Sequence, residues 1–155
     1  MAKKESKFSN NISIRNRQAR YEYEFLDVYV AGMSLRGTEI KSIRMGKVNM
    51  SSAFCVFHNN ELYVREMHIT PYELGTHENH DAKRERKLLL NRRELDKLKT
   101  KLDEKGLAIV PSKLFINARG LAKLEIALGR GKKLHDKRQS LKEKEQKREV
   151  SKIRY

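Results

Sequence analysis

The chain contains the segment Tyr21-Glu22-Tyr23-Glu24-Phe25-Leu26-Asp27-Val28-Tyr29-Val30-Ala31, which is rich in aromatic and β-branched residues. Residues of these types favour β-strands. Up to Phe25 the apolar side chains occupy every second position, and from Leu26 onward they occupy the alternate set. This shift predicts one long strand with a β-bulge near Leu26 and Asp27, and a bulge of this kind bends a sheet toward closure.

Further strands are predicted around two turn sequences. Asn59-Asn60 tolerates positive φ and predicts a tight hairpin, and Asn117-Ala118-Arg119-Gly120 predicts a second one. The additional predicted strands are Val48–His58, Glu61–Met67, Leu107–Asn117, Leu121–Leu128 and a short one over Met33–Arg36. Five or six antiparallel strands are few enough that closure would remove their exposed edges. We therefore expect a mainly β chain that forms a small antiparallel barrel.

An amphipathic helix is predicted over residues 91–105. Asn91-Arg92-Arg93-Glu94 resembles a capping box, three leucines follow on one helical face, and Gly106 supplies a C-terminal stop.

A second, shorter helix is predicted over Thr38–Met45, with Thr38 as its N-cap and Gly46 as its end. Lys41 and Arg44 lie three residues apart on this helix and give it a basic side. That side could face a phosphate backbone.

Positive charge is concentrated at the two ends of the chain, which carries a net charge of +15. Residues 1–20 hold 6 basic and 1 acidic side chains, residues 21–128 hold 18 and 15, and residues 129–155 hold 11 and 4. We expect a flexible basic N-terminus over 1–12, a folded barrel over 13–128 and a tail over 129–155. The tail has too few apolar residues to fold alone, so we expect it to stay disordered until a polyanion binds it.

Membrane and secreted proteins have no support in this sequence. The longest apolar run, Ala53–Phe57, is too short to span a bilayer, and no secretory signal precedes it. The single cysteine, Cys55, lies inside that run and is expected to be a buried thiol without redox chemistry. A cytoplasmic protein is expected.

Enzymatic and metal chemistry are not predicted either. His77-Glu78-Asn79-His80-Asp81 is the only metal-like cluster, but it lies in a polar stretch without helical pattern and without cysteines, so we expect a structural loop. The chain has no phosphate loop, nucleophile elbow or catalytic carboxylate pair. We expect a non-enzymatic protein with no metal and no cofactor.

Three basic runs within the body of the chain favour a nucleic-acid partner. They are Asn16–Arg20, with Arg17 and Arg20 on one helical face, Thr38–Lys47, with Lys41, Arg44 and Lys47, and Lys83–Lys87. Together with the basic tail they predict binding to phosphate backbones. Structured RNA is favoured over DNA because the sequence has no zinc-finger spacing, no heptads and no recognition-helix signature.

Five segments, in this order, match the pattern of one known family. They are Asn16-Arg17-Gln18-Ala19-Arg20-Tyr21-Glu22-Tyr23, Gly37-Thr38-Glu39-Ile40-Lys41-Ser42-Ile43-Arg44-Met45-Gly46-Lys47, Ile69-Thr70-Pro71-Tyr72, Arg86-Lys87-Leu88-Leu89-Leu90 and Gly131-Lys132-Lys133-Leu134-His135-Asp136-Lys137-Arg138. From about Ile14 to Glu149 the chain closely resembles the SmpB family of SsrA-binding proteins.

The resemblance implies an OB-like barrel, monomeric, that binds the tRNA-like domain of transfer-messenger RNA (tmRNA). Such a protein brings this RNA into the empty A site of a stalled ribosome in the process called trans-translation. The implied partners are therefore tmRNA and the ribosome, with its small-subunit RNA and decoding centre, and indirectly elongation factor Tu and alanyl-tRNA synthetase.

The basic runs and the resemblance together give the candidate site residues. The candidates for tmRNA binding are Asn16, Arg17, Arg20, Thr38, Glu39, Lys41, Arg44, Gly46, Lys47, Arg86, Lys87 and Leu89. The candidates for the decoding centre and the message channel are Gly131, Lys132, Lys133, His135, Asp136, Lys137, Arg138, Lys142, Lys144, Lys147 and Arg148. The resemblance implies that the tail becomes helical in the vacant channel, so that an unfolded basic segment tests whether message is present. His135 is suited to stack on an exposed base.

One position departs from the family pattern. The family often has Glu before Ala31-Gly32, and this chain has Val30, so an RNA contact made by that carboxylate does not transfer. Two other functions fit the composition: a constitutive ribosomal protein or assembly factor, and an RNA nuclease. A rescue adaptor, unlike a constitutive ribosomal protein, would be enriched on stalled ribosomes. A nuclease, unlike an adaptor, would cleave RNA in a metal-dependent assay.

Overall fold

The computed structural model describes residues 11–75, 78–132, 138 and 141–146. Its elements follow the order β1 (Ser13–Arg15), α1 (Arg17–Glu22), β2 (Tyr23–Met33), α2 (Gly37–Arg44), β3 (Val48–Asn49), β4 (Phe54–His58), β5 (Glu61–Arg65), β6 (His68–Ile69), β7 (Arg86–Leu89), α3 (Arg92–Leu102), β8 (Leu107–Ile116) and β9 (Ala122–Gly131). Arg138 and residues 141–146 are also helical. The described part contains no helix with the length and apolarity needed to cross a membrane.

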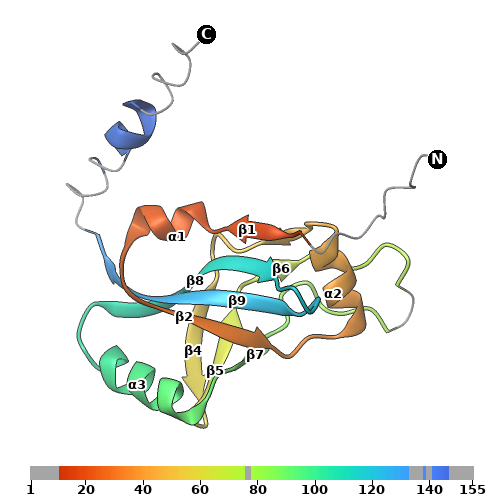
Figure 1. Cartoon of the computed structure of the whole chain (residues 1–155), viewed down its shortest axis with the longest axis horizontal. Coiled ribbons are helices and arrows are strands. Elements are labelled where there is room, and N and C mark those ends of the chain that lie inside the picture. Colours follow the sequence, from red (N-terminus) through yellow and green to blue (C-terminus); the bar gives the residue numbers. More distant parts are fainter. Residues whose placement is uncertain (1–10, 76–77, 133–137, 139–140, 147–155) are drawn as a thin grey trace.

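The main sheet closes into a barrel (Figure 1), as the sequence predicts. Its strands follow the order β8-β4-β5-β7-β2-β9, and β9 then pairs with β8, so β9 joins the two ends of the sheet. β1 adds to β8 outside this ring, and β3 pairs with β6 in a separate ribbon. All pairings are antiparallel, and buried side chains such as Leu62, Leu88, Leu114, Leu124 and Ile126 fill the interior.

The β-bulge in β2 is confirmed. The pairing register of β2 on β9 shifts between Phe25 and Asp27, with Leu26 as the extra residue. After the bulge, Ala31 is buried on the core side, whereas Val28 and Val30 on the other face are each about half exposed, at 51% and 50%. The predicted start at Tyr21 is wrong, because α1 extends to Glu22 and the strand begins at the next residue.

Both hairpins are confirmed, with changes at the strand ends. Asn59 and Asn60 have φ of 50° and 63° and join β4 to β5 in a two-residue turn. The predicted strand Val48–His58 is broken, since its first two residues pair with β6 and belong to the second ribbon. No separate strand forms over Met33–Arg36 in the structure; Met33 ends β2.

The last strand continues beyond residue 128, where we expected the barrel to end. Gly129 and Gly131 pair with Phe25 and Tyr23 and therefore lie in β9 rather than in a flexible joint. The tail prediction falls mostly on residues 133–137, 139–140 and 147–155, which lie outside the described residues, as do residues 1–10 of the predicted N-terminus.

Both predicted helices form. In α3, Asn91 Oδ1 accepts a hydrogen bond from the backbone N–H of Glu94 at 2.9 Å, and Leu95 and Leu98 pack into the core. In α2, the N-cap is Arg36 rather than the predicted Thr38. The Glu39 carboxylate accepts a hydrogen bond from the backbone N–H of Arg36 at 2.8 Å, which moves the helix start.

Candidate nucleic-acid interface

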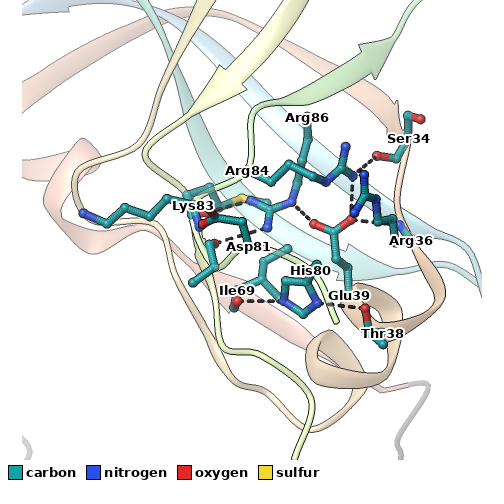
Figure 2. A network of polar contacts seen from close by, with 12 residues as sticks. Ser34, Arg36, Thr38, Glu39, Ile69, His80, Asp81, Lys83, Arg84 and Arg86 are labelled. Atoms are coloured by element: carbon teal, nitrogen blue, oxygen red, sulfur yellow. Dashed lines mark hydrogen bonds and ion pairs between the residues drawn. The ribbon is translucent and has the colours of Figure 1, made fainter. Parts of the chain in front are cut away.

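A buried ion-pair network fixes the first turn of α2 to the strand β7 (Figure 2). The side chains of Glu39 and Arg86 are both fully buried, and the Nε–H of Arg86 donates to Glu39 Oε2. Arg84 donates to Glu39 Oε1 at 2.5 Å and to the carbonyl of Ser34 at 3.1 Å. Arg86 also donates to the carbonyl of Met67 at 2.7 Å, so one guanidinium ties α2 to the segment between β5 and β6. The network sets where the basic side of α2 lies.

Burial alone would raise the pKa of Glu39, but hydrogen bonds from Arg84, from the backbone of Arg36 and from Arg86 outweigh it and lower that pKa. Burial lowers the pKa of Arg86, and the Glu39 carboxylate opposes that effect. The carboxylate therefore stays ionised inside the protein.

This lowered pKa predicts acid sensitivity. A carboxyl whose pKa is lower in the folded state stabilises the fold fully above its ordinary pKa, about 4.3, and that stabilisation is lost as pH falls through the lowered pKa. We expect the free energy of unfolding, measured in urea between pH 7 and about pH 3, to fall in this window. A Glu39→Gln variant should lose less over the same range; an equal loss would contradict the assignment to Glu39.

His80 is a structural residue that joins the loop after β6 to α2. Its Nε2 lies 2.9 Å from the carbonyl oxygen of Ile69, and its Nδ1 lies 2.9 Å from Thr38 Oγ1. Because a carbonyl only accepts, Nε2 donates, and in the neutral ring Nδ1 accepts from the Thr38 hydroxyl. Among the described residues no cluster of three His, Cys, Asp or Glu could hold a metal ion, and His77 lies outside them.

The basic side of α2 is held at the surface by this same loop. Lys41 Nζ lies 5.2 Å from the ring centroid of Tyr72, and Lys47 Nζ lies 2.6 Å from a carboxylate oxygen of Glu73. Arg44 Nη2 donates to the carbonyl of Gly120 at 3.4 Å, which links the helix to the turn between β8 and β9. These contacts orient the three cations, of which Lys41 is exposed while Arg44 and Lys47 are partly buried.

A pocket of about 410 Å³ lies beside α2. Arg44 and Leu89, both predicted, line it together with Arg36, Leu121 and Lys123, which sequence reasoning missed. Leu89 and Leu121 are exposed, at 52% and 54%, so the pocket presents apolar groups among three cations. One sequence signal for Leu121 was available: it is a large apolar residue directly after the glycine of a turn.

α1 carries a second group of predicted residues, and it lies at the other end of the barrel from α2 (Figure 1). Arg17 and Arg20 are exposed on α1 and line a cleft of about 460 Å³ with Lys132, Leu141 and Lys144. Asn16 is buried instead: its Nδ2 donates to the carbonyls of Met50 at 2.9 Å and Pro111 at 2.8 Å. The predicted RNA-binding residues are thus divided between two separate surfaces.

Three of the predicted RNA-binding side chains lie inside the fold. Asn16, Glu39 and Arg86 are 4%, 0% and 0% exposed, so their side chains support the interface and do not reach an RNA surface. The others are at least partly exposed: Arg17, Arg20, Thr38, Lys41, Arg44, Gly46, Lys47, Lys87 and Leu89. Of the tail candidates, Gly131, Arg138, Lys142 and Lys144 are exposed and Lys132 is partly exposed; Lys133, His135, Asp136, Lys137, Lys147 and Arg148 lie outside the described residues.

Known proteins match the chain over almost its whole length. A model of the SmpB protein family matches residues 13–154. An SsrA-binding protein of Christiangramia forsetii is 54% identical over 144 residues, which cover 93% of this chain and 92% of that protein. An SsrA-binding protein of Phocaeicola vulgatus is 53% identical over 142 residues, which cover 92% of this chain and 95% of that protein.

A solved structure is also similar. A chain in the structure described as "tmRNA-SmpB: a journey to the center of the bacterial ribosome" is 45% identical, with a TM-score of 0.69, and the match covers 83% of this chain and 94% of that chain. The chain therefore belongs to the SmpB protein family.

Proposed function

We propose that this protein is the RNA-binding adaptor of trans-translation. It binds the tRNA-like domain of tmRNA and brings it to the A site of a stalled ribosome, while the C-terminal tail probes the empty message channel. It acts by binding and has no catalytic role. The observation that carries the proposal is the pocket beside α2, where cations surround exposed leucines on a barrel whose relatives are SsrA-binding proteins.

The pocket side of the barrel supplies tmRNA recognition. Arg36, Arg44 and Lys123 offer charges to phosphates, while Leu89 and Leu121 offer apolar contact to ribose and base surfaces. RNA is recognised mainly by shape, by phosphates and by unstacked bases, and such a mixed surface suits all three. Thr38, Lys41, Gly46, Lys47 and Lys87 extend this surface, and Arg17 and Arg20 form a second contact on α1.

The tail supplies the test for an empty channel. Its candidates are Lys132, Lys133, His135, Asp136, Lys137, Arg138, Lys142, Lys144, Lys147 and Arg148. A channel walled by ribosomal RNA attracts a basic segment strongly, but a message strand already in the channel excludes it by charge and volume. The proposal includes elongation factor Tu and alanyl-tRNA synthetase as indirect partners, a monomeric protein, and action in the cytoplasm, where ribosomes work.

Leu89→Glu is expected to weaken binding of a transcript of the tRNA-like domain about 10-fold or more, because it places a carboxylate among the pocket's cations and repels phosphate. The measurement is a binding titration at fixed salt. Val28→Glu is the matched control, since Val28 is 51% exposed on the outer face of β2 and does not line the pocket. Equal losses in the two variants would argue against the pocket.

The partner itself is tested in cells. Tagged protein is purified from cells and its bound RNA is sequenced. The proposal expects one dominant small RNA with a tRNA-like end. It also expects the protein to be substoichiometric to ribosomes and enriched on stalled ones. Uniform recovery of ribosomal RNA, with no such small RNA, would indicate a constitutive ribosomal protein or assembly factor instead.

A further inference from the structure

The outer face of the barrel between β1 and β2 carries an aromatic ring among cations. The strand register places Ser13 opposite Phe115, Phe115 opposite Lys123, and Lys123 opposite Gly32. In the neighbouring row Arg15 lies opposite Lys113. These side chains alternate along their strands with Leu114 and Leu124, which are fully buried, so they point away from the core. We call Arg15, Lys113, Phe115 and Lys123 the β8 platform.

Phe115 is only partly buried although it is a large apolar residue. Lys113 Nζ lies 5.2 Å from its ring centroid, within the range of a cation–π contact. Lys113 therefore sets a positive charge against the ring of Phe115. Proteins that bind single-stranded nucleic acids use an aromatic ring between positive charges: a base stacks on the ring, and the charges hold the neighbouring phosphates.

The charges of the platform are poorly balanced within the protein. Like charges directly opposite each other destabilise a strand pair, and Arg15 and Lys113 are such a pair. Across the described residues, neither Arg15 nor Lys123 has a carboxylate within ion-pair distance. Glu125 is opposite Lys113, and its Oε2 accepts a hydrogen bond from Ser112 Oγ at 2.8 Å. A bound polyanion would relieve the remaining repulsion.

The platform is continuous with the pocket beside α2. A Cβ placed on Gly32 would lie 3.2 Å from Leu89 Cβ and 3.6 Å from Lys123 Nζ, so these two side chains meet over the glycine. Lys123 thus belongs both to the pocket and to the row that contains Phe115. An RNA that lies in the pocket can continue across the platform without a gap.

We propose that the β8 platform binds an unpaired, unstacked RNA base on the ring of Phe115, with the flanking phosphates on Lys123 and Arg15. The inference rests on the proposed function and extends its RNA-binding surface from the pocket across β8 to β1. Because every base has a π face, this contact adds affinity without selecting a particular base.

The test uses the full-length chain and a transcript of the tRNA-like domain of tmRNA. Phe115→Leu keeps an apolar side chain but removes the ring, and is expected to weaken binding about 5- to 20-fold, while Phe115→Tyr retains wild-type affinity. Phe54→Leu is the matched control, because Phe54 is 39% exposed on β4, outside the platform and the pocket. Thermal unfolding of each variant is measured alongside.

The contributions of charge and of stacking to RNA affinity are distinguished by measuring binding at several salt concentrations. Phe115→Leu should leave the slope of log affinity against log salt unchanged, whereas Lys123→Gln should reduce it by about one phosphate contact. Failure of the wild-type protein to bind the transcript would overturn the proposed function. Wild-type binding together with an unaffected Phe115→Leu variant, or with equal losses in Phe115→Leu and Phe54→Leu, would overturn the platform alone.

Discussion

A chain that ends after Lys132 is expected to bind the tRNA-like domain of tmRNA with nearly full affinity and to lose the rescue of stalled ribosomes. Lys132 is the right place to cut because β9 pairs with β2 up to Gly131, and the N–H of Lys132 donates to the carbonyl of Glu22 at 2.9 Å. The barrel and its pocket are therefore retained. The segment proposed to enter the message channel is removed, so the loss in tagging should be near complete.

Replacing Asp136, Lys137 and Arg138 with Ala is the milder form of this experiment. It keeps the length of the tail and is also expected to abolish tagging with little change in RNA affinity. The measurements are a binding titration with the tRNA-like transcript and a tagging assay on ribosomes stalled at the end of a truncated message. If RNA binding collapses with tagging, recognition and channel testing are not divided between barrel and tail.

Glu39→Gln is expected to cost about 3–5 kcal/mol in the free energy of unfolding, because it leaves the buried guanidinium of Arg86 without its charge partner. Both side chains are 0% exposed, so water cannot replace the lost interaction. RNA affinity should fall as well, since the same carboxylate holds the first turn of α2 in place. Urea unfolding of the variant and the wild type at neutral pH measures this difference in the free energy of unfolding.

The matched control is Glu85→Gln. Glu85 Oε2 lies 2.7 Å from Arg65 Nε, but these side chains are 38% and 46% exposed, and an exposed pair contributes less than about 1 kcal/mol. Losses of similar size in the two variants would mean that the buried pair does not fix α2.

The barrel could be predicted from sequence because its main signals are local. Each of these signals depends on a few neighbouring residues. They are the alternation from Tyr23 to Val30 with its shift at Leu26, the Asn59-Asn60 turn and the leucines of α3. The ribbon of β3 and β6 was missed because two-residue strands give no periodic pattern. The N-cap of α2 was placed wrongly at Thr38, because the choice between two start positions depends on where the Glu39 side chain goes.

The candidate site was predicted less completely, because it depends on contacts between residues far apart in the sequence. Glu39 and Arg86 are 47 positions apart, and no local pattern tells that a Glu and an Arg will meet inside the fold. One signal was available: Arg86 is two residues before the buried Leu88, so strand alternation puts both on the core side. Lys123 was missed because it becomes part of the site only when β9 pairs with β2.

The position of β9 in the ring also determines when the barrel can fold during translation. Its partners are β2, near the start of the chain, and β8, directly before it, so the ring stays open in the nascent chain until translation has passed Gly131. Pairing strands so distant in sequence is slow, and the open form exposes the unpaired edges of β2 and β8 in the meantime. A polypeptide truncated within β9 would therefore remain an open sheet, prone to aggregation and proteolysis, so a ribosome that stalls within the β9 codons of this protein's own message releases no folded barrel.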